Sequence, residues 1–232
     1  MIDALRRARA ALPQNPDRAL GALLEAWRMS RSPRVADLVD RVSAVVMEGR
    51  PPLPSQPVKA RTAAFLALAA RGDPADLGRL LQTPWPGTWK AALPVLEALR
   101  GFDDPRLAMA LARLLDATPF DTWTSDNFYR VLFAKLDALA DLRTLPLLEA
   151  GLSRNRSGYW RQGTRKREEA AVATLRRRFP QGAPPPTDEE AAELEAMERH
   201  FAGAVRSESA KREGETGFFA DVFARPDDDG LR

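Results

Sequence analysis

The sequence predicts an all-α fold, and three observations support this prediction. Apolar residues recur at steps of three and four, as in Leu20, Leu24 and Trp27, which is the spacing of one face of a helix. No stretch sustains the apolar and polar alternation that is typical of a half-buried strand. Finally, four capping residues stand directly before a proline, a pattern typical of helix starts. These are Asn15-Pro16, Ser32-Pro33, Asp73-Pro74 and Asp104-Pro105.

These signals divide the chain into many short helices with mostly short connections. We expect helices at residues 2–12, 16–30, 33–48, 57–71, 74–82, 88–100, 105–116, 126–140, 143–153, 164–179 and 187–211. Because short connections join most of them, successive helices should pack antiparallel. Composition then indicates five parts. They are an N-terminal helical cap at 1–56, helical repeats at 57–179, a stiff Pro-rich linker at 180–186, a charged amphipathic helix at 187–211 and a flexible acidic tail at 212–232.

A short motif with an aspartate and a nearby leucine recurs along the middle of the chain. It stands at Asp73-Pro74-Ala75-Asp76-Leu77, at Asp104-Pro105-Arg106-Leu107 and at Asp141-Leu142-Arg143-Thr144-Leu145. Each copy lies near an Ala/Leu-rich helix, and residues 57–179 as a whole resemble the HEAT repeat family. The resemblance implies stacked helical hairpins, an α-solenoid, in which each hairpin buries its apolar face against its neighbours. The alternative is a compact irregular helical bundle.

The charge of the chain is small in sum but unevenly distributed. The formal net charge is +3, yet residues 154–186 hold nine basic and two acidic groups, whereas residues 187–232 hold six basic and thirteen acidic groups. Cysteine is absent, which excludes disulfides and thiolate-ligated metals. No apolar run reaches the length of a membrane span, and the first ten residues lack the pattern of a secretory signal. We therefore expect a cytoplasmic protein without a membrane partner.

The sequence offers little for catalysis. Its one histidine, His200, lies in a highly charged predicted helix, so we expect a solvated surface residue and no catalytic triad. Metal ligands in register and a phosphate-binding loop are also lacking. These observations predict a protein that is not an enzyme and uses no cofactor, metal or small-molecule substrate. One enzymatic alternative is a HEAT-like DNA glycosylase, although no family motif matches residue by residue. Its candidate residues are Trp85, Trp89, Trp123, Trp160, Asp121 and Asp126.

The basic segment 154–167 is the clearest candidate for binding. Its cations and aromatics are Arg154, Arg156, Tyr159, Trp160, Arg161, Arg165, Lys166 and Arg167. Arginine grips carboxylates or phosphates bidentately, and an aromatic ring can stack on an exposed base. An acidic protein partner and a nucleic acid both fit this pattern, and so does a solvated connection between repeats.

The C-terminal part carries two further signals. Thr187-Asp188-Glu189-Glu190 is a capping-box pattern, and it opens a helix with the apolar stripe Leu194, Met197, Phe201 and Val205. We favour docking of this stripe on the protein itself over docking on a partner. Farther along, Phe218, Phe219, Val222 and Phe223 would share one helical face and form a docking motif. The opposite charges also suggest that the acidic tail masks the basic segment.

These predictions combine into one functional hypothesis. The chain is a non-catalytic scaffold or adaptor that binds a protein through its helical-repeat surface and its C-terminal tail. The alternative is a nucleic-acid-binding HEAT-like protein that uses residues 154–167.

Overall fold

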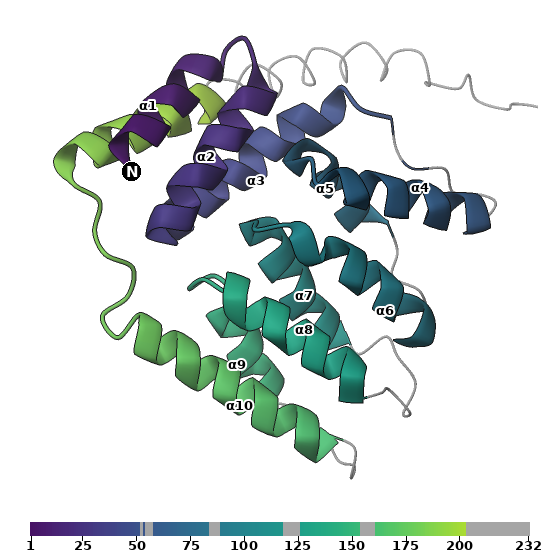
Figure 1. Cartoon of the computed structure of the whole chain (residues 1–232). Helices are drawn as coiled ribbons and strands as arrows, with labels where there is room; N and C mark the ends of the chain where they lie inside the picture. Colours follow the sequence, from purple (N-terminus) through teal and green to yellow (C-terminus); the bar gives the residue numbers. More distant parts are fainter. Residues whose placement is uncertain (52, 54–57, 84–88, 118–125, 154–160, 203–232) are drawn as a thin grey trace, which may run out of the picture.

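The computed structural model describes residues 1–51, 53, 58–83, 89–117, 126–153 and 161–202. Within them the regular secondary structure is helical, apart from one isolated β-bridge between Pro180 and Gly182. The helices follow in this order (Figure 1): α1 (Ile2–Ala11), α2 (Pro16–Ser30), α3 (Pro33–Glu48), α4 (Val58–Arg71), α5 (Pro74–Gln82), α6 (Trp89–Ala98), the 3₁₀ turn η1 (Leu99–Gly101), α7 (Pro105–Ala117), α8 (Asp126–Leu139), α9 (Leu145–Ser153) and α10 (Arg161–Arg178). A further helix, called here the C-terminal helix, covers residues 188–202. The predicted all-α class is confirmed for the described residues.

Local capping explains why so many helix starts could be predicted. Asn15 Oδ1 accepts a hydrogen bond from the Arg18 N–H at 3.0 Å, and Asp73 Oδ1 accepts one from the Ala75 N–H at 2.9 Å. Such bonds satisfy backbone donors that the first helical turn leaves unpaired. The prediction for Ser32 is wrong, because its side chain makes no capping bond to α3. Proline at the first position still gives α3 a suitable start there.

The helices from α3 onward pack in two alternating series. In one series α4 contacts α6, α6 contacts α8 and α8 contacts α10; in the other α3 contacts α5, α5 contacts α7 and α7 contacts α9. Contacts between neighbours in sequence, such as α7 with α8 and α9 with α10, join the two series. Each middle helix therefore buries apolar surface on more than one side, which agrees with the fully buried leucines Leu77, Leu96, Leu107 and Leu136.

Helix α3 crosses the row of helix starts in this array. Arg50, just beyond its end, binds Asp76 of α5 at 2.9 Å, whereas Ser43 binds Arg106 of α7. At the middle of α3, Asp40 binds Arg143, which precedes α9, at 2.7 Å. An α-helix rises about 1.5 Å per residue, so ten residues span about 15 Å. That length is close to two interaxial spacings of about 8–10 Å each. The segment from Asp40 to Arg50 can therefore reach the starts of α5, α7 and α9, which lie side by side.

The C-terminal helix returns to the other end of the chain. A connection at residues 179–187 leaves α10, and the C-terminal helix then lies beside α1, far from α10 (Figure 1). Its predicted capping box is present: Glu190 accepts from the Thr187 N–H at 3.1 Å, and Thr187 Oγ1 accepts from the Glu190 N–H at 3.3 Å. The division of the chain into a cap, repeats, a linker, a helix and a tail stays a prediction, and residues 203–232 lie outside the described part.

Candidate functional site

The structure describes only part of the predicted basic segment. Arg165, Lys166 and Arg167 lie in the first half of α10, where Arg165 and Lys166 are exposed and Arg167 is partly buried. Arg161 begins the same helix, but its side chain is outside the described part. Arg154, Arg156, Tyr159 and Trp160 also lie outside the described residues.

Helix α10 has one buried and one exposed face. Its buried face, with Ala171, Val172 and Leu175, faces the array, where α10 contacts α8 and α9. The opposite side is called here the α10 outer face, and its positions span about 140° of the helix at 100° per residue. It comprises the exposed residues Arg165, Lys166, Glu169, Ala170, Ala173, Arg176 and Arg177.

Four cations and one carboxylate make the α10 outer face basic. Arg165 pairs with Glu169 at 3.1 Å, and Arg176 pairs with Glu149 of α9 at 2.8 Å. Within the described residues Lys166 has no carboxylate partner, and Arg177 donates only to its own helix, at 3.4 Å to both Ala173 O and Thr174 Oγ1. The α10 outer face therefore presents two cations that an external carboxylate or phosphate could bind without breaking an ion pair.

The C-terminal helix is bound to the first helices of the chain. Its apolar stripe is buried: Leu194 is 0%, Met197 1% and Phe201 9% exposed. Docking on the protein itself is confirmed for these three residues, whereas Val205 lies outside the described part. Burying one such side chain stabilises by about 1.5–3 kcal/mol, so the stripe is the main source of docking free energy.

Ion pairs set the orientation of this docked helix. They join Arg6 to Glu189 at 3.1 Å, Arg9 to Glu193 at 3.0 Å and Arg34 to Glu198 at 2.9 Å. Most of these side chains are partly exposed, so each pair contributes about 0.2–1 kcal/mol. Arginines of α1 and α3 thus bind these glutamates, whereas the suggestion that the acidic tail masks the basic segment stays a prediction, because residues 203–232 lie outside the described part. Phe218, Phe219, Val222 and Phe223 lie outside the described residues.

Buried ion pairs at the starts of α5, α7 and α9 form what we call the helix-start network. It comprises Asp76, Asp104 and Asp141 with Arg50, Arg71, Arg79, Arg106 and Arg143. Burial alone would raise the pKa of Asp76, but hydrogen bonds and charge from Arg71, Arg50 and Arg79 outweigh it and lower the pKa. Arg50 and Arg71 join Asp76 to the ends of α3 and α4, whereas Asp104–Arg106 and Asp141–Arg143 each pair within one helix start.

Asp141 joins the helix-start network to the core. Its Oδ1 accepts from the Arg143 N–H at 2.9 Å, and its Oδ2 accepts from Trp27 Nε1 at 3.3 Å. Burial raises the pKa of Asp141 even though the positive charge of Arg143 lowers it in part. Trp27 is fully buried, and the Arg31 guanidinium stacks 4.0 Å from its ring centroid. Sequence reasoning did not predict this contact between residues 114 positions apart.

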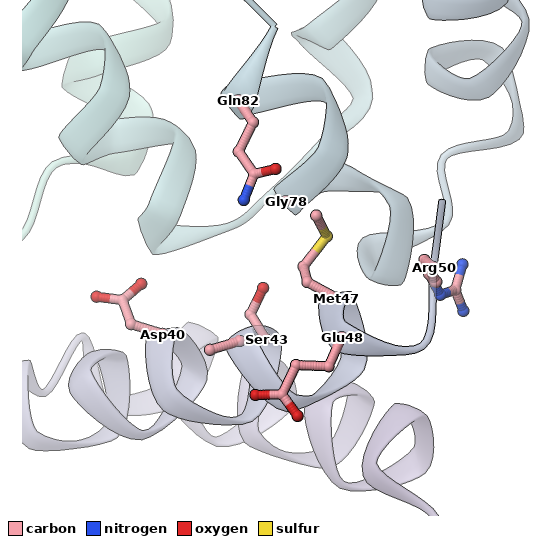
Figure 2. A pocket seen from close by; sticks show the side chains of 8 residues that line it. Asp40, Ser43, Met47, Glu48, Arg50, Gly78 and Gln82 are labelled. Carbon is pink, nitrogen blue, oxygen red and sulfur yellow. The ribbon is translucent and has the colours of Figure 1, made fainter. Parts of the chain in front are cut away.

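A pocket of about 560 Å³ lies between α3 and α5. Its lining is Asp40, Ser43, Ala44, Met47, Glu48, Arg50, Gly78 and Gln82. Figure 2 shows Met47 pointing from α3 toward Gly78, and the amide of Gln82 facing Asp40 and Ser43 across the space. A Cβ at Gly78 would stand 2.7 Å from Met47 Sδ, so glycine permits the close approach of the two helices.

The residues weighed for catalysis stay largely untested. His200 is exposed on the C-terminal helix, with its ring edge-on to Phe201 at 5.5 Å, as expected of a surface residue. In the described part of the chain, no group of three or more acidic or histidine side chains could hold a metal ion. The side chains named for the glycosylase alternative all lie outside the described part.

No helix among the described residues is long and apolar enough to cross a membrane. Comparison with known proteins identifies no relative: no family model, no curated protein and no solved structure matches this chain.

Proposed function

We propose that the chain is a non-catalytic HEAT-like scaffold that binds an acidic protein through the α10 outer face and the adjoining basic segment. The observation that carries this proposal is the composition of the α10 outer face. Lys166 and Arg177 are exposed, and neither has a carboxylate partner in the described part of the chain. Exposed arginine and lysine side chains without an ionic partner attract carboxylates, and arginine can bind them bidentately.

The packing order supports the HEAT-like part of the proposal. In a solenoid each helix contacts the equivalent helix of the next repeat, and the contacts of α4 with α6, α6 with α8 and α8 with α10 are compatible with such an order. Helix α10 is the last member of that series, and its outer face is polar and charged. A terminal repeat needs such a face to remain soluble, so α10 suits both the end of an array and a recognition surface.

Nucleic acid is the second candidate, because an array of cations can equally bind phosphates. The two candidates differ in their dependence on salt. Each phosphate neutralised by Lys or Arg releases a counterion, so binding to DNA weakens steeply and log-linearly with salt concentration. Specific protein contacts add apolar and hydrogen-bonded terms that salt screens less.

The proposal is tested by charge reversal in the full chain. We expect Lys166→Glu with Arg177→Glu to remove a partner that proximity labelling detects around the wild-type chain in cells. The matched control reverses Arg18 and Arg113, two exposed cations on α2 and α7, and should keep that partner. Labelling that is the same for both double variants would contradict the proposal. Equilibrium binding to a fluorescent single-stranded oligonucleotide, measured over a range of salt, decides the nucleic-acid alternative.

A further inference from the structure

The surface of α1 and α3 beneath the C-terminal helix is complementary to an acidic amphipathic helix. Three arginines, Arg6, Arg9 and Arg34, bind Glu189, Glu193 and Glu198 of the C-terminal helix. Between these pairs, Leu194 and Met197 are buried almost completely. This surface therefore recognises both the charge and the apolar spacing of its ligand, which is a segment of the same chain.

The connection between α10 and the C-terminal helix is weakly attached to the rest of the molecule. Its one internal turn places the Gly182 N–H 3.2 Å from Phe179 O. Among the described residues, no hydrogen bond joins residues 183–186 to any other part of the chain. Pro184, Pro185 and Pro186 favour an extended backbone of about 3.1 Å per residue. Residues 183–186 therefore add no hydrogen bond that would be lost if the helix left its own surface.

In the described part of the chain, the ion pairs of the C-terminal helix go to α1 and α3, and none goes to α10, the helix that leads into the linker. A helix supplied by another molecule could form the same pairs and bury the same side chains. Exchanging an identical element between two copies conserves the contacts of that element and is a low-cost route to a dimer. A second copy of this chain therefore carries a helix that is complementary to the surface of α1 and α3.

We propose that the C-terminal helix of one copy docks on α1 and α3 of a second copy, and that the second returns its helix to the first. Docking within one chain competes with this exchange through the effective concentration that the linker sets. A stiff linker samples fewer conformations that return the helix to its own surface. Because exchange joins two chains and docking within one chain does not, the exchanged dimer gains population as protein concentration rises. This inference is independent of the partner proposed for α10.

Charge reversal on opposite sides of the interface forces the exchange. One full-length variant carries Arg6→Glu with Arg9→Glu, and the other carries Glu189→Arg with Glu193→Arg. In each variant alone, like charges face one another both within a chain and between identical chains, so we expect a monomer near 25.6 kDa. In the mixture the reversed pairs are complementary only between different variants, whereas Arg34 and Glu198 are unchanged in both. Light scattering should then show a species of twice that mass, and a mixture that stays monomeric would overturn the proposal.

Crosslinking tests whether the helix is exchanged without charge reversal. The chain has no native cysteine, so one chain can carry only Arg9→Cys and a second, affinity-tagged chain only Glu193→Cys. A short bis-maleimide suits this site, because the Cβ atoms joined by an Arg–Glu pair stand farther apart than a disulfide permits. We expect a tagged heterodimer whose yield rises with protein concentration. Ala192→Cys, on the exposed side of the same helix, is the matched control and should give little product. If the two positions crosslink no better than the control, at concentrations where the charge-reversed mixture dimerises, exchange does not occur in the native chain.

Discussion

Truncating Leu194 tests whether the C-terminal helix opens independently of the rest of the fold. This side chain is fully buried in the docked helix. Leu→Ala substitutions in cores cost about 2–5 kcal/mol, but the loss here cannot exceed the free energy of docking, because a helix that has left its surface has nothing more to lose. Three buried apolar side chains and three partly exposed ion pairs provide that free energy, and the ordering of the helix opposes it. We therefore expect Leu194→Ala to shift most molecules toward the undocked state.

Hydrogen exchange measured by mass spectrometry is the appropriate assay, because it reports opening segment by segment. A loss of about 2 kcal/mol corresponds to exchange roughly 30-fold faster, since each 1.4 kcal/mol is a factor of ten. The acceleration should be confined to residues 188–202 and the adjoining turns of α1, whereas α2 around Trp27 should keep its protection. Glu195→Ala, on the exposed side of the helix, is the control. Equal loss of protection in the helix and around Trp27 would refute independent opening.

Three further substitutions test the contacts that hold the fold. Asp76→Asn should lower the free energy of unfolding by about 3–5 kcal/mol at pH 7, since it leaves guanidiniums around a neutral amide. The pKa of Asp76 is lowered in the folded state. Its contribution to the free energy of unfolding is therefore complete above the unfolded pKa of about 3.9 and is lost progressively as pH falls below that value. Urea titrations of the wild type and the variant at pH 7 and pH 3 measure how this contribution changes. Arg106→Met leaves buried Asp104 unpaired and should cost about 3–5 kcal/mol, whereas adding Asp104→Asn should restore part of the stability in chemical denaturation. Thr187→Ala removes the Oγ1 acceptor of the Glu190 N–H and should cost about 0.5–2 kcal/mol, seen as faster exchange in the first turn of the C-terminal helix and no change in α2.

Helix positions could be predicted from sequence because their signals are local. Asn15 and Asp73 cap the helices that follow them, and Thr187 forms the predicted capping box with Glu190. In each case the residues that decide the structure lie within a few positions of one another. Even so, α10 begins at Arg161, three residues before the predicted start, because no capping residue or proline marks that boundary.

Ion pairs between residues far apart in the sequence could not be predicted, because a charged side chain can pair with any opposite charge. The glutamates of the C-terminal helix could pair with any arginine in a chain that has thirty. The structure selects Arg6, Arg9 and Arg34 because burial of the apolar stripe on α1 and α3 brings those side chains within reach. Hydrophobic packing thus decides the position, and the ion pairs follow it. A weak signal for the helix-start network was present in the repeated Asp-x-Arg at 104–106 and 141–143, where each aspartate accepts from the backbone N–H two residues later.

The positions of α10 and the C-terminal helix bear on how the two proposed binding sites would act together. The two lie at opposite ends of the molecule (Figure 1), with the helix-start network between them. Coupling between distant sites requires an element with two arrangements that both sites bias. The contacts of α3 argue against such an element, because moving α3 relative to α5 would unpair buried Asp76 from Arg50, and moving it relative to α7 would break the bond between Ser43 and Arg106. A partner on α10 and an exchanged helix on α1 and α3 should therefore bind independently, so that one chain could join an acidic partner at one end to a second copy of itself at the other.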